Sequence, residues 1–176
     1  MKNLLLIITC VLLFAFGVFA QAPKTEINRP QSEPEMQALA RKACGTTSVD
    51  YDAETKKDQH PTPEAPSDKA LIYVMRTTII GYKIHSKLAV DGNWMGTNRG
   101  KTYFFFTLDP GEHHFCSESE NQDGVTFTVE AGKTYYLQQQ VKAGMWKART
   151  KLALLDDERG KKELADLNLS VFMLKQ

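Results

Sequence analysis

The chain has 176 residues, of which 42% are hydrophobic, and it carries 22 Lys and Arg against 21 Asp and Glu. This length suffices for one hydrophobic core of ordinary size. Because binders of nucleic acid or of acidic membranes need a basic surface, the balanced charge argues against both classes.

Residues 1–20 are typical of an export signal. Lys2 supplies a positive charge, Leu4–Phe16 form an apolar run, and we expect cleavage after Ala20. Cys10 lies in a poor context for lipidation, so a lipoprotein is not expected. No later apolar run has membrane-spanning length. The sequence thus predicts an exported, soluble protein, periplasmic or extracellular, with no membrane span after cleavage.

Cleavage would leave two cysteines, Cys44 and Cys116. Two cysteines in an oxidising compartment usually pair, so we expect a disulfide. It would close a loop of roughly 70 residues and stabilise the fold by about 4 kcal/mol in the chain-entropy view. Two separate buried thiols are the alternative.

Residues 21–68 predict an N-terminal helix followed by a polar linker. Ser32 and Glu35 form a capping-box pattern, apolar residues then recur at helical spacing, and Gly45 follows the expected end at Cys44. Residues 46–68 are rich in Pro, Asp, Lys, Thr and Ser, which is typical of a loop. Such a segment either wraps the domain or stays mobile.

Residues 69–155 change to the pattern of strands. Ala70–Met75 has no polar interruption, which predicts a central strand buried on both faces. Turn signals at Asp91-Gly92, Pro110-Gly111 and Ala131-Gly132 separate further short strands. Seven or eight strands at spacings of about ten residues predict a mainly β fold, a small antiparallel β-sandwich of transthyretin or Ig-like type.

Residues 156–176 predict a C-terminal helix and a tail. Asp156 and Asp157 can cap a helix that extends to about Leu167, and Gly160 would weaken it by about 1 kcal/mol relative to Ala. The apolar tail Val171–Leu174 should dock on the domain.

Four motifs in this order resemble a known family. They are Lys69–Arg76, then Val90-Asp91-Gly92 with Gly96, then Leu108–His113, and finally Ala131–Tyr136. Together they resemble the bacterial domain of unknown function family 2846 over about Lys69 to Leu155, and the middle part is similar to PEGA repeats of small β-sandwich domains. The resemblance implies a fold and no catalytic residues.

Two adjacent histidines, His113 and His114, raise the question of a metal site. Neighbouring side chains on a strand point to opposite faces, so a shared ion would need a remote partner such as His85. A structural role for both histidines is therefore expected, and no cofactor is predicted. A metal-dependent enzyme that uses them is the alternative function.

The run Tyr103–Phe106 places aromatic side chains on both faces of one strand. Phe104 and Phe106 align with Leu108 and should be core, so Tyr103 and Phe105 form the outer pair. That pair either lies under one of the two helices or, with Trp94, forms an exposed binding face. On the second interpretation the protein is a non-enzymatic envelope module that binds a protein or a cell-wall glycan.

Overall fold

A computed structural model describes residues 25–45, 47–143 and 148–175, so the predicted export signal lies outside the described residues. The described part contains ten strands in two sheets and two helices. In chain order the elements are α1 (Glu33–Ala43), β1 (Tyr51–Lys56), β2 (Ala70–Arg76), β3 (Ser86–Val90), β4 (Asn93–Asn98), β5 (Thr102–Leu108), β6 (Gly111–Glu118), β7 (Gln122–Val129), β8 (Thr134–Ala143), β9 (Ala148–Leu155), α2 (Asp157–Ala165) and β10 (Asn168–Leu174).

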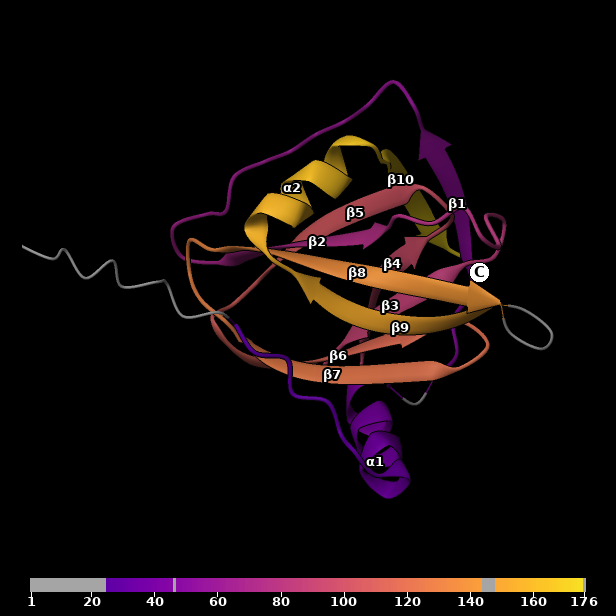
Figure 1. The fold of residues 1–176 in the computed structure, drawn as a ribbon, viewed down its shortest axis with the longest axis vertical. Coiled ribbons are helices and arrows are strands. Elements are labelled where there is room, and N and C mark those ends of the chain that lie inside the picture. Colours follow the sequence, from indigo (N-terminus) through magenta and orange to yellow (C-terminus); the bar gives the residue numbers. More distant parts are fainter. Residues whose placement is uncertain (1–24, 46, 144–147, 176) are drawn as a thin grey trace, which may run out of the picture.

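The first sheet has the order β1-β10-β5-β2-β8-β9 and the second the order β4-β3-β6-β7 (Figure 1). The expectation of purely antiparallel pairing is wrong for the first sheet, because β2 pairs with β8 and β10 with β5 in parallel. Parallel neighbours need a long crossover connection. The whole second sheet lies between β2 and β8 in the chain, and α2 precedes β10. The mainly β class is confirmed, whereas the transthyretin or Ig-like type stays a prediction.

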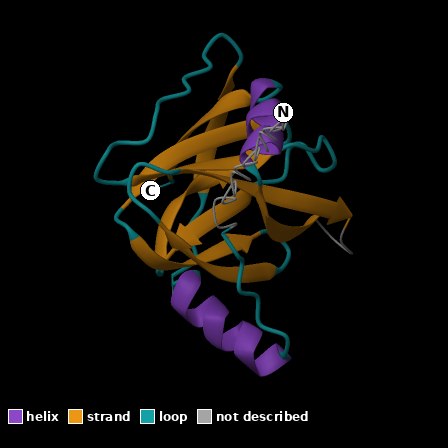
Figure 2. Cartoon of the chain, turned by 60° about the vertical axis from the view of Figure 1, so that its left-hand side comes forward, coloured by secondary structure: helices purple, strands orange, loops and turns teal. Residues whose placement is uncertain are grey.

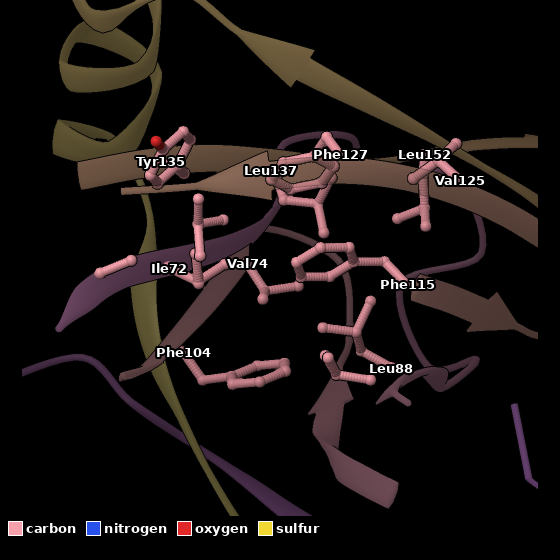
Figure 3. Close-up of a cluster of buried hydrophobic side chains, with 13 residues drawn as sticks. Ile72, Val74, Leu88, Phe104, Phe115, Val125, Phe127, Tyr135, Leu137 and Leu152 are labelled. Carbon is pink, nitrogen blue, oxygen red and sulfur yellow. The ribbon is translucent and has the colours of Figure 1, made fainter. Parts of the chain in front are cut away.

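The main core lies between the two sheets (Figure 3). Each sheet contributes apolar side chains that are almost fully buried, among them Ile72 and Leu137 from the first sheet and Leu88, Phe115 and Phe127 from the second. The rings of Phe115 and Phe127 stack with centroids 4.2 Å apart. Burial of such side chains from both sheets is the main force that holds the sheets together.

A second core lies on the other face of the first sheet. It consists of Leu71, Tyr73, Met75, Tyr103, Tyr136, Leu155, Leu164 and Leu167. Helix α2 and the segment between β1 and β2, residues 57–69, cover it; we refer to this segment as the strap. The strap arches from the end of β1 past α2 to the start of β2, and α1 lies at the opposite end of the molecule (Figures 1 and 2).

The sequence did not predict β1 and β10 as strands. The polar run from Tyr51 to Lys56 was expected to be loop, yet it pairs antiparallel with the C-terminal tail over six residues. Only Tyr51 of β1 is buried, which is typical of a strand at the edge of a sheet. The tail docks as expected, and Phe172 packs edge-on against Tyr51 and Phe104.

Helix α1 begins and ends where the sequence predicts. The backbone N–H of Ser32 donates to Glu35 at 3.3 Å, and Cys44 follows the last helical residue. Cys44 forms a disulfide with Cys116 of β6, with Cα atoms 5.1 Å apart, which is the predicted pairing. The N–H of Gly92 in the β3–β4 turn also donates to the carbonyl of Ala43, so two bonds of different kind attach α1 to the second sheet.

The Asp91-Gly92 hairpin is confirmed, with positive φ at both residues (49° and 81°), the geometry of a type I′ turn. The turns at Pro110-Gly111 and Ala131-Gly132 serve a different purpose, because each connects a strand of one sheet to a strand of the other.

Replacing Gly160 with Ala should destabilise the protein, although Ala is the better helix former. A Cβ at this position would lie 2.2 Å from the ring of Tyr136, so either the helix or the buried ring would have to move. Overpacking of this kind costs about 1–3 kcal/mol. Urea unfolding measures the loss, and Lys162→Ala on an exposed position of α2 is the control. A more stable Gly160→Ala variant would show that α2 does not approach Tyr136 this closely.

The disulfide should be present in protein purified from an oxidising compartment. Its intact mass should then be two hydrogens below that of the reduced form. The bond spans 72 residues, so Cys44→Ser should lower the free energy of unfolding by about 4 kcal/mol. Two thiols that alkylate in the unreduced, denatured protein would contradict the pairing.

Candidate functional site

A hollow lies where α2 and the strap cross the first sheet. It consists of two adjoining cavities of about 670 and 530 Å³. They share Gly132, Thr134, Tyr136 and Lys161, so we treat them as one cleft. Volumes of this size are typical of sites for small ligands.

Stacked tyrosines form part of the cleft lining. Tyr73 of β2 and Tyr136 of β8 are direct neighbours in the parallel register, and their rings stack at 5.5 Å with an angle of 8°. Both are almost fully buried. Desolvation raises the pKa of Tyr73 to about 12 and also raises that of Tyr136. Both phenols are therefore neutral at physiological pH.

The strap is held by the aromatic residues beneath it. The hydroxyl of Tyr73 donates to the carbonyl of Pro63 and that of Tyr103 to the carbonyl of Pro61, each at 2.9 Å. The ring of His60 lies 5.1 Å from that of Tyr103, and its Nδ1 is 3.0 Å from the carbonyl oxygen of Leu167. The wall of the cleft formed by the strap is thus fixed to the sheet and to the residues after α2.

Polar side chains of both charges surround the tyrosines. Glu64 of the strap, Asp157 and Lys161 of α2, and Lys133 before β8 line the cleft and are exposed. Thr62 and Thr134 add hydroxyl groups. The cleft therefore offers groups that can donate and accept hydrogen bonds, above two tyrosine rings that are almost fully buried.

The predicted aromatic binding face is not assembled as expected. Tyr103 and Phe105 do form the outer pair, while Phe104 belongs to the core between the sheets. However, Tyr103 is fully buried and Phe105 is half-buried, because the strap and α2 cover this face. An exposed platform at Tyr103 is therefore wrong, and the covered alternative is correct, with the C-terminal helix as part of the cover.

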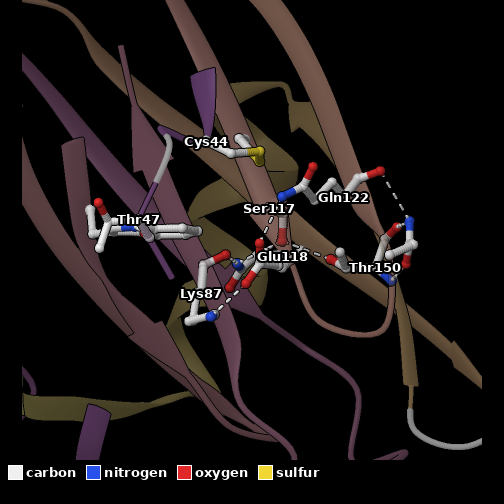
Figure 4. The surroundings of a disulfide bond; sticks show 11 residues. Cys44, Thr47, Lys87, Ser117, Glu118, Gln122 and Thr150 are labelled. Atoms are coloured by element: carbon white, nitrogen blue, oxygen red, sulfur yellow. Dashed lines mark hydrogen bonds and ion pairs between the residues drawn. A yellow bond between two sulfur atoms is a disulfide. The ribbon is translucent and has the colours of Figure 1, made fainter. Parts of the chain in front are cut away.

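Trp94 lies on the second sheet, away from the other two residues. Its Nε1 donates to the carbonyl of Thr47 at 2.7 Å, and it packs beside the Cys44–Cys116 disulfide. The ammonium group of Lys87 lies 5.0 Å from the indole. It also lies 2.5 Å from the carboxylate of Glu118 (Figure 4). Trp94 therefore has structural partners in the carbonyl of Thr47, the ammonium group of Lys87 and the disulfide.

The two histidines have separate partners. His113 Nδ1 lies 2.6 Å from the carboxylate of Asp91, and Nε2 lies 2.9 Å from the carbonyl oxygen of Asp109. His114 Nδ1 lies 2.8 Å from the hydroxyl of Thr126. Within the described residues no group of three or more His, Cys, Asp or Glu could hold a metal ion. His113 instead connects the Asp91-Gly92 hairpin to the β5–β6 turn.

Sequence reasoning missed the cleft because its parts were interpreted as a buried strand, a linker and a peripheral helix. Tyr73 lies within the apolar run of β2, and the strap was predicted to be a linker. The available signal was a tyrosine in a strand buried on both faces, because a buried hydroxyl needs a hydrogen-bond partner. That partner is the strap.

Comparisons with known proteins agree with the sequence motifs. Residues 66–151 match the model of a family described as protein of unknown function (DUF2846), the family that the sequence motifs resemble. An uncharacterized protein of Haemophilus influenzae is 28% identical over 136 residues, which cover 76% of this chain and 80% of that protein. No solved structure matches the chain. The similarity to PEGA repeats stays a prediction.

The family match includes both stacked tyrosines but excludes most of the strap and all of α2. The cleft is therefore built from the matched region and from two segments outside it. Neither described helix is long and apolar enough to cross a membrane.

The hydrogen bonds of His113 predict a pH dependence of stability. Burial by itself would lower the pKa of His113, but the bonds to Asp91 and to the Asp109 carbonyl, with their nearby charges, outweigh it and raise the pKa. A raised pKa in the folded state stabilises the fold below the unfolded pKa of about 6.5, and this contribution is lost as the pH rises through the folded pKa.

The free energy of unfolding of the wild type should therefore exceed that of His113→Gln by more at pH 6 than at pH 8. For this partly exposed pair, the excess should differ between the two pH values by about 0.5–1 kcal/mol. Urea unfolding at both pH values measures it. Asp91→Asn should remove most of the difference. An advantage that is equal at both pH values would contradict a charged His113–Asp91 pair.

Proposed function

We propose that this protein is an exported, non-enzymatic binding module of the bacterial cell envelope, and that the cleft beside α2 binds cell-wall glycan. The single observation that carries the proposal is the composition of the cleft. Tyr73 and Tyr136 line it together with charged and hydroxyl side chains from the strap, α2 and the start of β8.

Glycan chemistry matches this lining. A sugar ring carries a rim of hydroxyl groups that need hydrogen bonds, and the hydroxyl and charged side chains of the cleft can supply them. Cell-wall glycan also carries carboxylates, for which Lys161 and Lys133 offer positive partners.

The disulfide and the export signal support the envelope as the location. Disulfides persist in oxidising compartments and are rare in the cytosol. Residues 1–20 carry the pattern of an export signal. A location in the envelope brings the cleft within reach of the cell wall.

The histidines give the alternative of a metal-dependent enzyme little support. Both ring nitrogens of His113 are engaged by Asp91 and Asp109, and His114 has a different partner. A shared ion would have to break these bonds.

Two charge reversals on α2 test the proposal. Lys161 lines both cavities, whereas its exposed neighbour Lys162 lines neither. Lys161→Glu should weaken co-sedimentation with purified peptidoglycan about fivefold, as expected for the loss of one exposed charge contact. Lys162→Glu changes the net charge equally and should bind as the wild type does.

Melting temperatures of both variants should match that of the wild type, because each lysine is exposed. Failure of the wild type to co-sediment would overturn the proposal. An equal loss in both variants would show that binding depends on net charge and not on the cleft.

A further inference from the structure

The loop between β2 and β3, residues 77–85, exposes an apolar tip. Ile79, Ile80 and Tyr82 are 68%, 52% and 56% exposed. Seven large hydrophobic residues are exposed in the described part of the chain, and three of them lie within these four positions. More than half of each side chain faces solvent, so the tip projects and does not line a groove.

The loop is held in place by a buried arginine. Arg76 is fully buried at the end of β2 and donates to the carbonyls of Ile80 at 2.7 Å, Gly81 at 2.6 Å and Ile84. The carbonyl of Tyr82 accepts from the N–H of Gly100 at 3.0 Å. The exposed side chains thus extend from a backbone that is fixed from inside, which lowers the entropy lost on binding.

Positive charge gathers around the tip. Lys83 lies in the loop, and its ammonium group is 5.8 Å from the ring of Tyr82. Arg99 and Lys101 lie in the β4–β5 turn that contacts the loop through Gly100. There is no Asp or Glu between Asp68 and Asp91, nor between Asp91 and Asp109.

The neighbouring elements do not neutralise this charge. Burial lowers the pKa of His85 in the loop, and the positive charges of Arg99, Lys175 and Arg76 lower it further, against an opposite effect of Asp50. Of the carboxylates on β1, Asp52 pairs with Lys175 at 3.4 Å. Lysine and arginine side chains therefore gather around the loop, although the whole chain is nearly neutral.

We infer that the 77–85 loop docks on the surface of an anionic phospholipid membrane. Isoleucine and tyrosine side chains can enter the boundary between headgroups and acyl chains, and lysine and arginine can then contact the lipid phosphates. A projecting apolar tip suits a deformable lipid layer better than a rigid protein surface. The balanced charge of the chain argues against binding of acidic membranes by the surface as a whole. It does not argue against binding by this loop, around which lysine and arginine gather.

Vesicle flotation tests the inference. The protein without residues 1–20 should float with vesicles that contain phosphatidylglycerol and should float weakly with vesicles of phosphatidylcholine alone. Added salt should release it, because contacts between cations and anionic headgroups are screened. The double variant Ile79→Ser/Ile80→Ser should lose about tenfold or more in apparent affinity.

Met36→Ser is the matched control, because Met36 is an exposed apolar residue on α1, away from the loop. It should float as the wild type does. Lys83→Glu should reduce binding to the anionic vesicles, and the circular dichroism spectra of all variants should match that of the wild type.

Three results would overturn the inference. They are the absence of flotation, unchanged flotation of the double variant, and equal flotation with both vesicle types. If the wild type self-associates without binding vesicles, and the double variant no longer self-associates, the tip forms contacts between copies of the chain. The result does not depend on the glycan proposal, because no residue of the loop lines the cleft.

Discussion

Strand β2 has apolar or aromatic side chains on both of its faces, and each face must be covered. Ala70, Ile72 and Val74 face the second sheet, while Leu71, Tyr73 and Met75 face α2 and the strap. One sheet packed on another would cover only the first set. The helix after β9 and the strap before β2 are therefore parts of the core and not appendages. The cleft exists because two separate covers, a helix and an irregular segment, meet over the same strand.

Buried polar side chains fix the position of one sheet relative to the other. Gln139 of β8 is fully buried and donates to the carbonyls of Ser86 and Lys87 and to the hydroxyl of Ser117. Its own side-chain carbonyl accepts from Asn98 at 3.1 Å. Because β8 belongs to one sheet and the others to its partner, a shift of either sheet would leave buried polar groups unsatisfied. Apolar packing holds the sheets together, and this network selects one relative position.

The sequence predicted local features well and pairing over long distances poorly. The α1 capping box, the Asp91-Gly92 turn and the two-sided burial of β2 each depend on neighbouring residues, and each is found. Strand β1 forms only because the tail, more than a hundred residues later, lies beside it. Its polar residues carry no periodic apolar signal that would reveal the pairing. The same limit hid the cleft, whose walls come from the strap, β8 and α2.

Gly160 shows why an element can be placed correctly and still be misjudged. The sequence treats this glycine as a weak point of the helix, which holds for an isolated helix. In the folded protein it lets α2 contact the ring of Tyr136, which in turn stacks on Tyr73. The helical cost is offset by closer packing over the second core. A glycine that disfavours an isolated helix therefore favours the folded protein, because it allows α2 to pack closely on the ring of Tyr136.

The two proposed surfaces lie at opposite ends of one rigid element. The cleft includes residues at the start of β8, which pairs in parallel with the start of β2, while Arg76 at the end of β2 holds the apolar loop. Seven residues of strand separate these ends by roughly 20 Å. A module of this geometry that rests on a membrane through the loop would hold its cleft away from the lipid, toward the space in which a cell-wall polymer lies. The rigid strand fixes that orientation, so membrane attachment and ligand binding would need no conformational change to act together.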